Sequence, residues 1–199
     1  NQVNGEVTGV ELSSGTVLRS KIVVSNADPQ HTYQSLLNKD SATATMRSWR
    51  WKSQRPSMSL YVFYFGLGKQ IRPTPLAHHS ILFGENLAKA IKTIFSRDSS
   101  KVSIGEDYFY YVHLPTLTDD TIAPKNCDSL YVLAAVPALH KKNRSEQSQS
   151  QIIRQDILHK LENYLPGISS HIEVEHHIDP EYFETTLASP FGSAFSAQP

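Results

Sequence analysis

The sequence is poor in cysteine and has no excess of charge of either sign. Its 199 residues include one cysteine, Cys127, so the chain cannot build a disulfide framework or a zinc site made of several thiolates. The 19 Lys and Arg residues are balanced by 19 Asp and Glu residues. This balance argues against a nucleic-acid partner, because phosphate binding needs surplus positive charge.

Long hydrophobic runs are also missing. The longest apolar stretches, residues 60–67 and 130–139, are interrupted by Gly66 and Pro137. Both are far shorter than the about 20 residues of a membrane-spanning helix. No signal peptide is visible at the start, and the first residue is Asn1 rather than methionine. We therefore expect a processed chain or an internal piece of a longer protein, with a length typical of one domain.

Aromatic residues are plentiful, with 9 Tyr, 8 Phe and 2 Trp, and strand patterns dominate the first part of the chain. Residues 6–12 and 16–18 flank the turn sequence Ser-Ser-Gly and predict a hairpin. The continuous apolar run 21–24 is typical of a strand buried on both faces, as in a parallel sheet. Asp28 and Pro29 then predict the start of a short helix.

Further strands and helices alternate along the rest of the chain. Alternating apolar positions predict strands over residues 57–65, 79–83, 108–114, 130–136 and 171–178. Helical spacing predicts helices over residues 87–95, 152–165 and 181–187, with a weaker helical pattern within 38–56. The polar stretch 141–150 indicates a disordered or inserted segment. These patterns predict an α+β fold.

Motifs that carry chemistry are scarce. The nine histidines include the adjacent pairs His78-His79 and His176-His177, and neighbours on a strand point to opposite faces, so we predict no metal site. Gly66-Leu67-Gly68 follows a strand but lacks a third glycine at position 71, and the prolines after it prevent the helix that a dinucleotide site requires. No nucleophile motif is present. We predict no catalytic residue in this chain.

Several stretches taken together resemble one family, the bacterial and fungal type phytoene desaturases, which are FAD-dependent carotenoid enzymes. The matching sequences are VTGVELSSGTVLRSKIVVSNADPQHTYQSLL (7–37), SMSLYVFYFGL (57–67), LAHHSILFG (76–84), YFYYVHLPTLTDDTIAPKNCDSLYVLAAVP (108–137), LPGISSHI (165–172) and FGSAFSAQP (191–199). The resemblance covers nearly the whole chain. It departs from the family where Pro190-Phe191 stands in place of a Tyr-His pair.

The resemblance implies an FAD cofactor whose main binding motif lies outside this chain. It further implies three segments: 1–28, the end of an FAD-binding segment; 29–188, a substrate-binding and membrane-facing region; and 189–199, the start of a return to the FAD domain. The implied fold has a mixed, largely antiparallel sheet with flanking helices and one returning strand of the FAD domain. The predicted cofactor-binding residues are Val24, Ser25, Asn26 and Ala27. An alternative is that residues 25–27 only shape a turn and cap a helix.

The implied reaction is desaturation of phytoene or a similar carotenoid, with hydride transfer to the flavin and proton loss from the adjacent carbon. A polyene needs an apolar wall, and the predicted substrate-binding residues are Tyr61, Phe63, Phe65, His79, Ile81, Phe83 and Tyr110. The alternative is that these side chains are ordinary core. Alternative functions are a related carotenoid isomerase, a desaturase of another carotenoid, or a non-catalytic lipid- or carotenoid-binding module.

Contact with a membrane surface is expected because a long polyene dissolves in the bilayer. The apolar positions of helix 87–95, with Lys89 and Lys92 opposite, are the best interfacial candidate. The expected location is therefore cytoplasmic and peripherally membrane-associated. The sequence leaves the oligomeric state open.

Overall fold

The computed structural model describes residues 2–3, 6–37, 55–96, 107–139 and 148–197. Its main feature is a five-stranded sheet in the order β6-β7-β8-β5-β9, in which every neighbouring pair is antiparallel. The strands are β5 (Ser59–Leu67), β6 (His79–Leu82), β7 (Tyr110–His113), β8 (Asp128–Val136) and β9 (Ile172–Ile178). Together with the helices, this sheet confirms the predicted α+β class.

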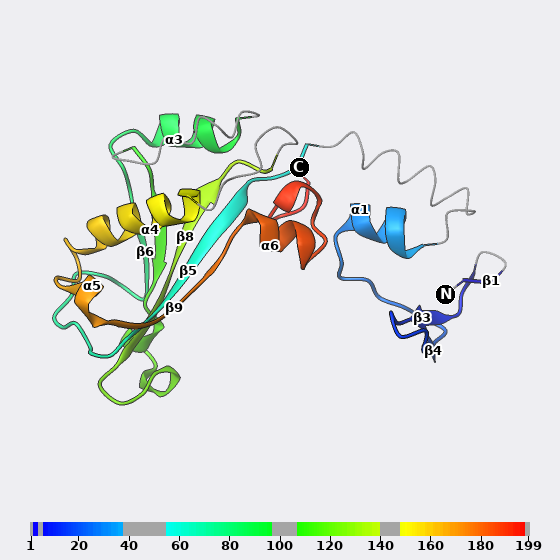
Figure 1. Ribbon diagram of the computed structural model, residues 1–199, viewed down its shortest axis with the longest axis horizontal. Helices are drawn as coiled ribbons and strands as arrows, with labels where there is room; N and C mark the ends of the chain where they lie inside the picture. The colour runs from blue at the N-terminus through cyan, green and yellow to red at the C-terminus, as the bar shows by residue number, and fades with distance from the viewer. Residues whose placement is uncertain (1, 4–5, 38–54, 97–106, 140–147, 198–199) are drawn as a thin grey trace.

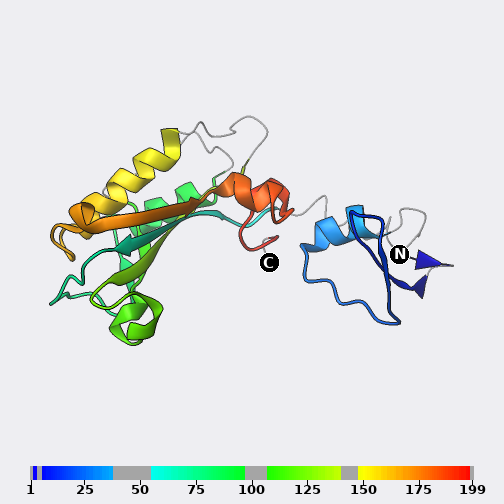
Figure 2. The ribbon, with the colours of Figure 1, turned by 60° about the horizontal axis from the view of Figure 1, so that its bottom comes forward.

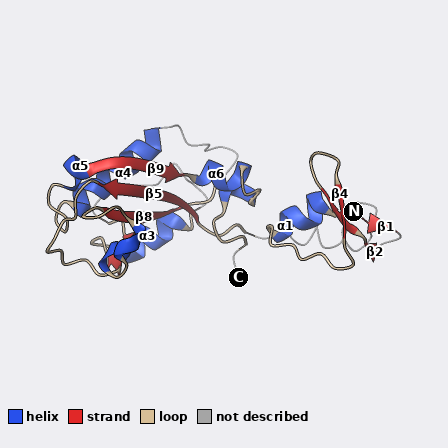
Figure 3. Ribbon diagram, turned by 90° about the horizontal axis from the view of Figure 1, so that it is seen from below, coloured by secondary structure: helices blue, strands red, loops and turns tan. Residues whose placement is uncertain are grey.

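The helices α3 (Leu87–Ile94) and α4 (Ser148–Leu161) cover one face of the sheet (Figure 1). A view turned by 60° shows α4 lying along β9 and β5 (Figure 2), and from below the strands lie in front of α4 (Figure 3). Shorter elements complete this part: η3 (Pro115–Leu117), η4 (Asp120–Ile122), α5 (Ile168–His171), α6 (Pro180–Thr185) and η5 (Pro190–Gly192).

The covered face contains most of the hydrophobic core. Alternate residues of each strand point toward α3 and α4, as the period of two requires. On β5 these are Tyr61, Phe63 and Phe65, each exposed by only 1–2%, while the intervening Tyr64 is 40% exposed. The helices contribute Ile94, Ile153, Ile157 and Leu161 to the same cluster. We call the residues on this side the covered face and those on the opposite side the open face.

The first part of the chain has little core of its own. It contains β1 (Gln2–Val3), β2 (Glu6–Val7), β3 (Gly9–Glu11) and β4 (Val17–Arg19), followed by α1 (Pro29–His31) and the wider turn η1 (Thr32–Leu36). The β3–β4 pair is the predicted hairpin, with Gly15 at a positive φ of 83° in its turn. Asp28 caps α1 by accepting a hydrogen bond from the Gln30 N–H, as predicted.

The predicted buried strand at residues 21–24 is wrong for this chain. These residues form no strand, and Ile22 and Val24 are 79% and 88% exposed. A strand that is buried on both faces belongs to a sheet that is covered on both sides. No strand of the described residues pairs with this segment, so it has no such sheet to join. The weak helix within 38–56 and the polar stretch 141–150 lie mainly outside the described residues.

Candidate functional site

The open face of the five-stranded sheet carries an unusual set of aromatic and histidine side chains. Its members come from all five strands and are His79, Ile81, Tyr111, His113, Tyr131, Leu133, Tyr64, Val174 and His176. Ile81 and Val174 are 54% and 67% exposed, and Phe83, just after β6, is 64% exposed. An exposed surface of this apolar character marks a binding surface more often than an ordinary solvated face does.

Ring contacts run across the open face from one edge of the sheet to the other. The Tyr64 ring lies 6.2 Å from the His176 ring on one side and 5.7 Å from the Tyr131 ring on the other. The Tyr131 ring is 6.0 Å from that of Tyr111 and 4.7 Å from that of His113. These are ordinary distances for paired rings, so the strand register has aligned the side chains into a continuous aromatic surface.

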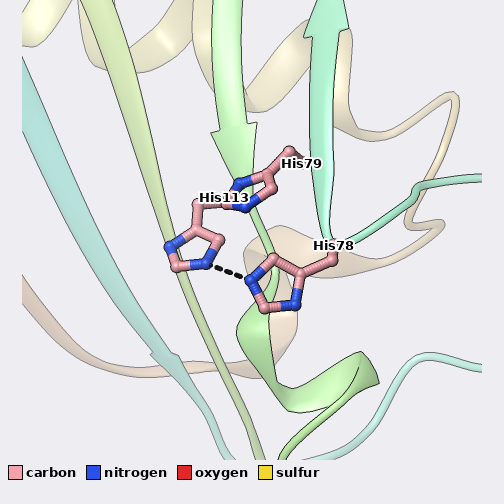
Figure 4. Close-up of side chains that lie close together, drawn as sticks. All are labelled: His78, His79 and His113. Atoms are coloured by element: carbon pink, nitrogen blue, oxygen red, sulfur yellow. Dashed lines mark hydrogen bonds between the residues drawn. The ribbon is translucent and has the colours of Figure 1, made fainter.

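Three histidines gather at one end of the open face (Figure 4). The antiparallel register of β6 and β7 pairs His79 with His113, and the ring of His78 comes within 4.6 Å of the His113 ring. The Nε2 atoms of His78 and His113 are 2.7 Å apart, so one of them donates a hydrogen to the other. Burial, with the added effect of His78 and His79, lowers the pKa of His113.

The prediction that the adjacent His78 and His79 point to opposite faces is wrong. It assumes that both residues belong to the strand, whereas β6 begins only at His79. The backbone of His78 accepts a hydrogen bond from the Leu114 N–H, and its ring turns toward His113. His113 is not among the site residues predicted from the sequence. The signal that could have found it is the pairing of two predicted strands, each with a histidine at its end.

The structure divides the predicted substrate-binding residues between the two faces. His79, Ile81 and Phe83 lie on or beside the open face. Tyr61, Phe63, Phe65 and Tyr110 lie on the covered face, exposed by 1–2%. The Tyr110 hydroxyl donates to Asp156 of α4, and burial together with this carboxylate raises the pKa of Tyr110. These four side chains pack against the helices and are not accessible from the open face.

A second feature lies where the first part of the chain approaches its last residues. A small pocket of about 20 Å³ is lined by Asp28, Gln30, Arg55, Pro56, Pro190, Phe191, Ser196 and Ala197. One of its lining residues, Asp28, directly follows the predicted cofactor-binding residues 24–27 in the sequence. On the other side the pocket is lined by Phe191, Ser196 and Ala197 of the predicted flavin-side segment 191–199. The pocket therefore brings Asp28 and Gln30, which follow the predicted cofactor-binding residues, next to the segment around Phe191.

The turn that forms one wall of this pocket has a strained backbone. Phe191 and Gly192 both have positive φ values, of 60° and 61°. A Cβ at Gly192 would lie 2.3 Å from the Pro180 carbonyl oxygen, so only glycine fits there. The turn is fixed by the Ser59 hydroxyl, which donates to the Gly192 carbonyl, and by the Leu139 N–H, which donates to the Phe191 carbonyl at 2.7 Å. A strained residue that is held so firmly is typical of a functional site.

Known proteins similar to this chain are desaturases of carotenoids. The chain is 36% identical over 195 residues to the lycopene-forming phytoene desaturase of Pantoea ananas, a match that covers 98% of this chain and 38% of that enzyme. It is 37% identical over 205 residues to the neurosporene-forming phytoene desaturase of Rhodobacter capsulatus, covering 98% of this chain and 37% of that enzyme. The resemblance to phytoene desaturases is confirmed. The chain spans somewhat more than a third of the length of these relatives.

The fold also has a counterpart among solved structures. An oxidoreductase from Methanosarcina mazei matches 89% of this chain and 35% of its own, with a TM-score of 0.50 and 14% sequence identity. At this identity the match concerns the fold alone, and it supports the α+β class. No family model matches the chain. Among the described residues, no helix is both long and apolar enough to cross a membrane.

Proposed function

We propose that this chain provides the substrate-side sheet of an FAD-dependent carotenoid desaturase and that its open face forms one wall of the polyene site. The observation that carries the proposal is the exposed aromatic surface over all five strands, together with relatives that are named for desaturation of phytoene. A polyene has no hydrogen-bonding groups, so aliphatic and aromatic side chains are the contacts that can bind it.

The apolar residues of the open face are the proposed contacts of the hydrocarbon. Ile81, Phe83 and Val174 are more than half exposed, and Tyr64 offers a ring of which 40% is accessible. His79 extends the same surface toward the histidine end of the sheet. We assign no catalytic residue to this chain.

We propose that the flavin is held partly by residues 24–27 and partly by the segment around Phe191. Val24 is 88% exposed and so is accessible to a group bound from outside the chain. The adjacent pocket has room for about one water-sized group, so most of the flavin's surroundings would come from elsewhere. When bound, the flavin supplies the hydride acceptor, and the chain positions the substrate. The segments 1–28, 29–188 and 189–199 are the corresponding proposed divisions.

A chimera tests the function directly. Residues 1–199 would replace the matching stretch of the Pantoea ananas relative, and the chimera would be produced in a host that accumulates phytoene. We expect coloured desaturation products on chromatography. A folded, flavin-loaded chimera that leaves phytoene unchanged would contradict the proposal, and products of a different carotenoid or an isomerised product would favour the alternative reactions.

A matched pair of isoleucines tests the role of the open face within this chimera. Ile81 on the open face is 54% exposed and Ile152 on α4 is 53% exposed, so Ile81→Asp and Ile152→Asp make the same change at the same exposure. We expect Ile81→Asp to reduce product at least tenfold, because a carboxylate costs several kcal/mol beside a hydrocarbon. Ile152→Asp should retain most of the activity. Equal effects of the two substitutions would remove the open face from the substrate site.

We also propose that α3 rests on a membrane surface, from which the polyene enters. Its buried side consists of Ala90 and Ile94, while Leu87, Ile91 and Phe95 are 39%, 43% and 51% exposed. Lys89 lies on the same helix, where it pairs with Asp107. Exposed apolar residues beside lysines are typical of interfacial helices.

The membrane contact can be measured by co-sedimentation with vesicles that contain anionic lipid. Replacing both Ile91 and Phe95 with Asp should reduce the bound fraction several-fold, because about 25 cal/mol is lost for each Å² of apolar surface that no longer enters the bilayer. Ile152→Asp serves as the control on the neighbouring helix. Unchanged binding by the folded double variant would disprove the contact.

A further inference from the structure

The three histidines at the end of the open face have the composition of a transition-metal site. One ligand nitrogen from each of His78, His79 and His113 can be chosen so that all three lie within 4.8 Å of one another. Figure 4 shows the rings converging from β6, from the residue before it and from β7. Three neutral imidazoles with one open position are a recurring ligand set for zinc, and they also suit cobalt, nickel and copper.

The Nδ1 atoms of His78 and His79 each lie within hydrogen-bonding distance of a hydroxyl group. The Nδ1 atom of His78 lies 2.5 Å from the Thr118 hydroxyl, which in turn donates to the Pro115 carbonyl at 3.3 Å. Because that hydroxyl already donates, it accepts from Nδ1–H of His78, and the lone pair of His78 is left on Nε2. The Nδ1 atom of His79 lies 2.7 Å from the Tyr111 hydroxyl, an arrangement that can fix the same tautomer. Partners of this kind orient metal-bound histidines.

His113 occupies the position that connects the other two. Its Nε2 faces Nε2 of His78 at 2.7 Å, and its ring lies 4.7 Å from that of His79. Among the side-chain atoms that the structure describes, its Nδ1 is buried and has no hydrogen-bond partner. A buried protein nitrogen without a hydrogen-bond partner is uncommon and requires an explanation. With the ring hydrogen on Nε2, this Nδ1 carries the lone pair of the neutral His113 ring.

We propose that His78, His79 and His113 bind a divalent transition metal, with zinc as the preferred ion and a water molecule at the fourth position. The metal replaces the hydrogen between the two Nε2 atoms, and His113 changes tautomer so that its hydrogen moves to Nδ1. Proton number is therefore conserved when the histidines are neutral. In a tetrahedral site with Zn–N bonds of about 2.0–2.1 Å, the two nitrogens lie about 3.3 Å apart, so they separate by about 0.6 Å. His79 is exposed and its ring can turn toward the ion.

The site would connect the start of β6 to the end of β7. These strands form the far edge of the sheet, and they pair through only four residues each. A metal held by residues from both strands would stabilise this edge, since an ion that binds only the folded chain adds its binding energy to folding. The site lies at the polar end of the open face and does not depend on the proposed desaturase function.

Zinc titration of the chelator-treated chain, purified without a histidine tag, tests this proposal. We expect calorimetry to show one zinc ion per chain. Cobalt should produce the visible absorption bands of a tetrahedral site, which a loosely bound ion would lack. His79→Ala should weaken zinc binding at least about a hundredfold, because the loss of outer partners alone costs 10–100-fold. Thr118→Val, which removes one such partner, should weaken binding about tenfold.

The second histidine pair provides the matched control. His176 also lies exposed on the open face and contacts the Tyr64 ring, but it is outside the cluster, so His176→Ala should bind zinc as the unaltered chain does. If His113→Ala fails to fold, the exposed His79 still decides the question. The proposal is overturned if zinc does not saturate at one ion per chain, if His79→Ala leaves the affinity unchanged, or if His176→Ala weakens binding equally.

Discussion

The two faces of the five-stranded sheet are built from the same strands but differ in how far the helices cover them. On β5, Phe63 is 1% exposed beneath the helices, whereas its neighbour Tyr64 is 40% exposed on the other side. On β8, Leu130 and Val132 are buried, while Tyr131 between them contacts rings on the open face. The covered face is closed by α3 and α4 and determines stability. The open face leaves large apolar side chains accessible and is therefore available for binding.

The two faces should differ most in how much free energy of unfolding is lost when an aromatic side chain on each face is truncated. Phe63→Ala removes a fully packed ring and should lower the free energy of unfolding by about 3–5 kcal/mol. Tyr64→Ala should cost about 1 kcal/mol or less, because much of that ring is already in water. Urea denaturation of both variants measures the difference. Similar losses for both would mean that the open face is packed as tightly as the covered one.

The covered face also ends in an ion pair between the buried Asp128 and the partly exposed Arg72, which should be the next most sensitive point. Asp128 at the start of β8 accepts two hydrogen bonds from Arg72, at 2.6 and 2.9 Å, and a third from Thr116 at 2.6 Å. Asp128→Asn should cost about 1.5–3 kcal/mol, the range for hydrogen bonds to a charged group. Arg72→Lys is the control, because it keeps the charge and loses the two-pronged geometry. An Asn variant as stable as the unaltered chain would show that the charge is dispensable.

Alkaline pH should weaken the packing of the covered face. Burial, the hydrogen bond to Asp156 and the charge of that carboxylate raise the pKa of Tyr110, and burial raises that of Tyr108. A raised pKa in the folded state gives stability that is present below the unfolded value of about 10 and is lost as the pH rises above it. The chain should therefore lose stability above about pH 10, with covered-face tyrosines ionising only on unfolding.

Tyr110→Phe separates the two contributions of this side chain. At neutral pH it should cost about 1.5 kcal/mol, the low end for a hydrogen bond to a charged group, because the Asp156 carboxylate is partly exposed to solvent. At alkaline pH the variant should lose less stability than the unaltered chain. Absorbance at the tyrosinate band, recorded together with circular dichroism, measures both. Ionisation of Tyr110 in a fully folded chain would contradict the assignment.

Local signals in the sequence predicted the fold well. Asp28 with Pro29 and Asp179 with Pro180 each start a helix as predicted, because an N-cap acts within one helical turn. The alternation along residues 57–65 correctly predicted a strand with two distinct faces. It did not show which face the helices cover, because helix docking depends on residues far away in the sequence. The substrate prediction therefore included Tyr61, Phe63 and Phe65, which the structure places in the core.

Non-local pairing explains the other differences. Residues 21–24 have the composition of a buried strand, but composition contains no information on which partner strands are present. His78 and His79 come together with His113 because β6 and β7 pair in one register, and a shift of one residue would move the side chains to the other face. Neither outcome can be read from a short window of sequence.

The position of β5 between β8 and β9 has a consequence for how the chain folds during synthesis. Leu60 pairs with Ala135, and Val62 pairs with Ile178, so the central strand is made before both of its neighbours and obtains the second one only when β9 has been made. Such distant pairing slows folding, because the entropy of closing a long loop is lost before the contacts form. Until β9 emerges, an aromatic-rich strand has an unpaired edge that can add to another chain. Recovery of folded protein should therefore depend on how quickly the C-terminal third is completed, and chaperones that bind unpaired strands should improve the yield.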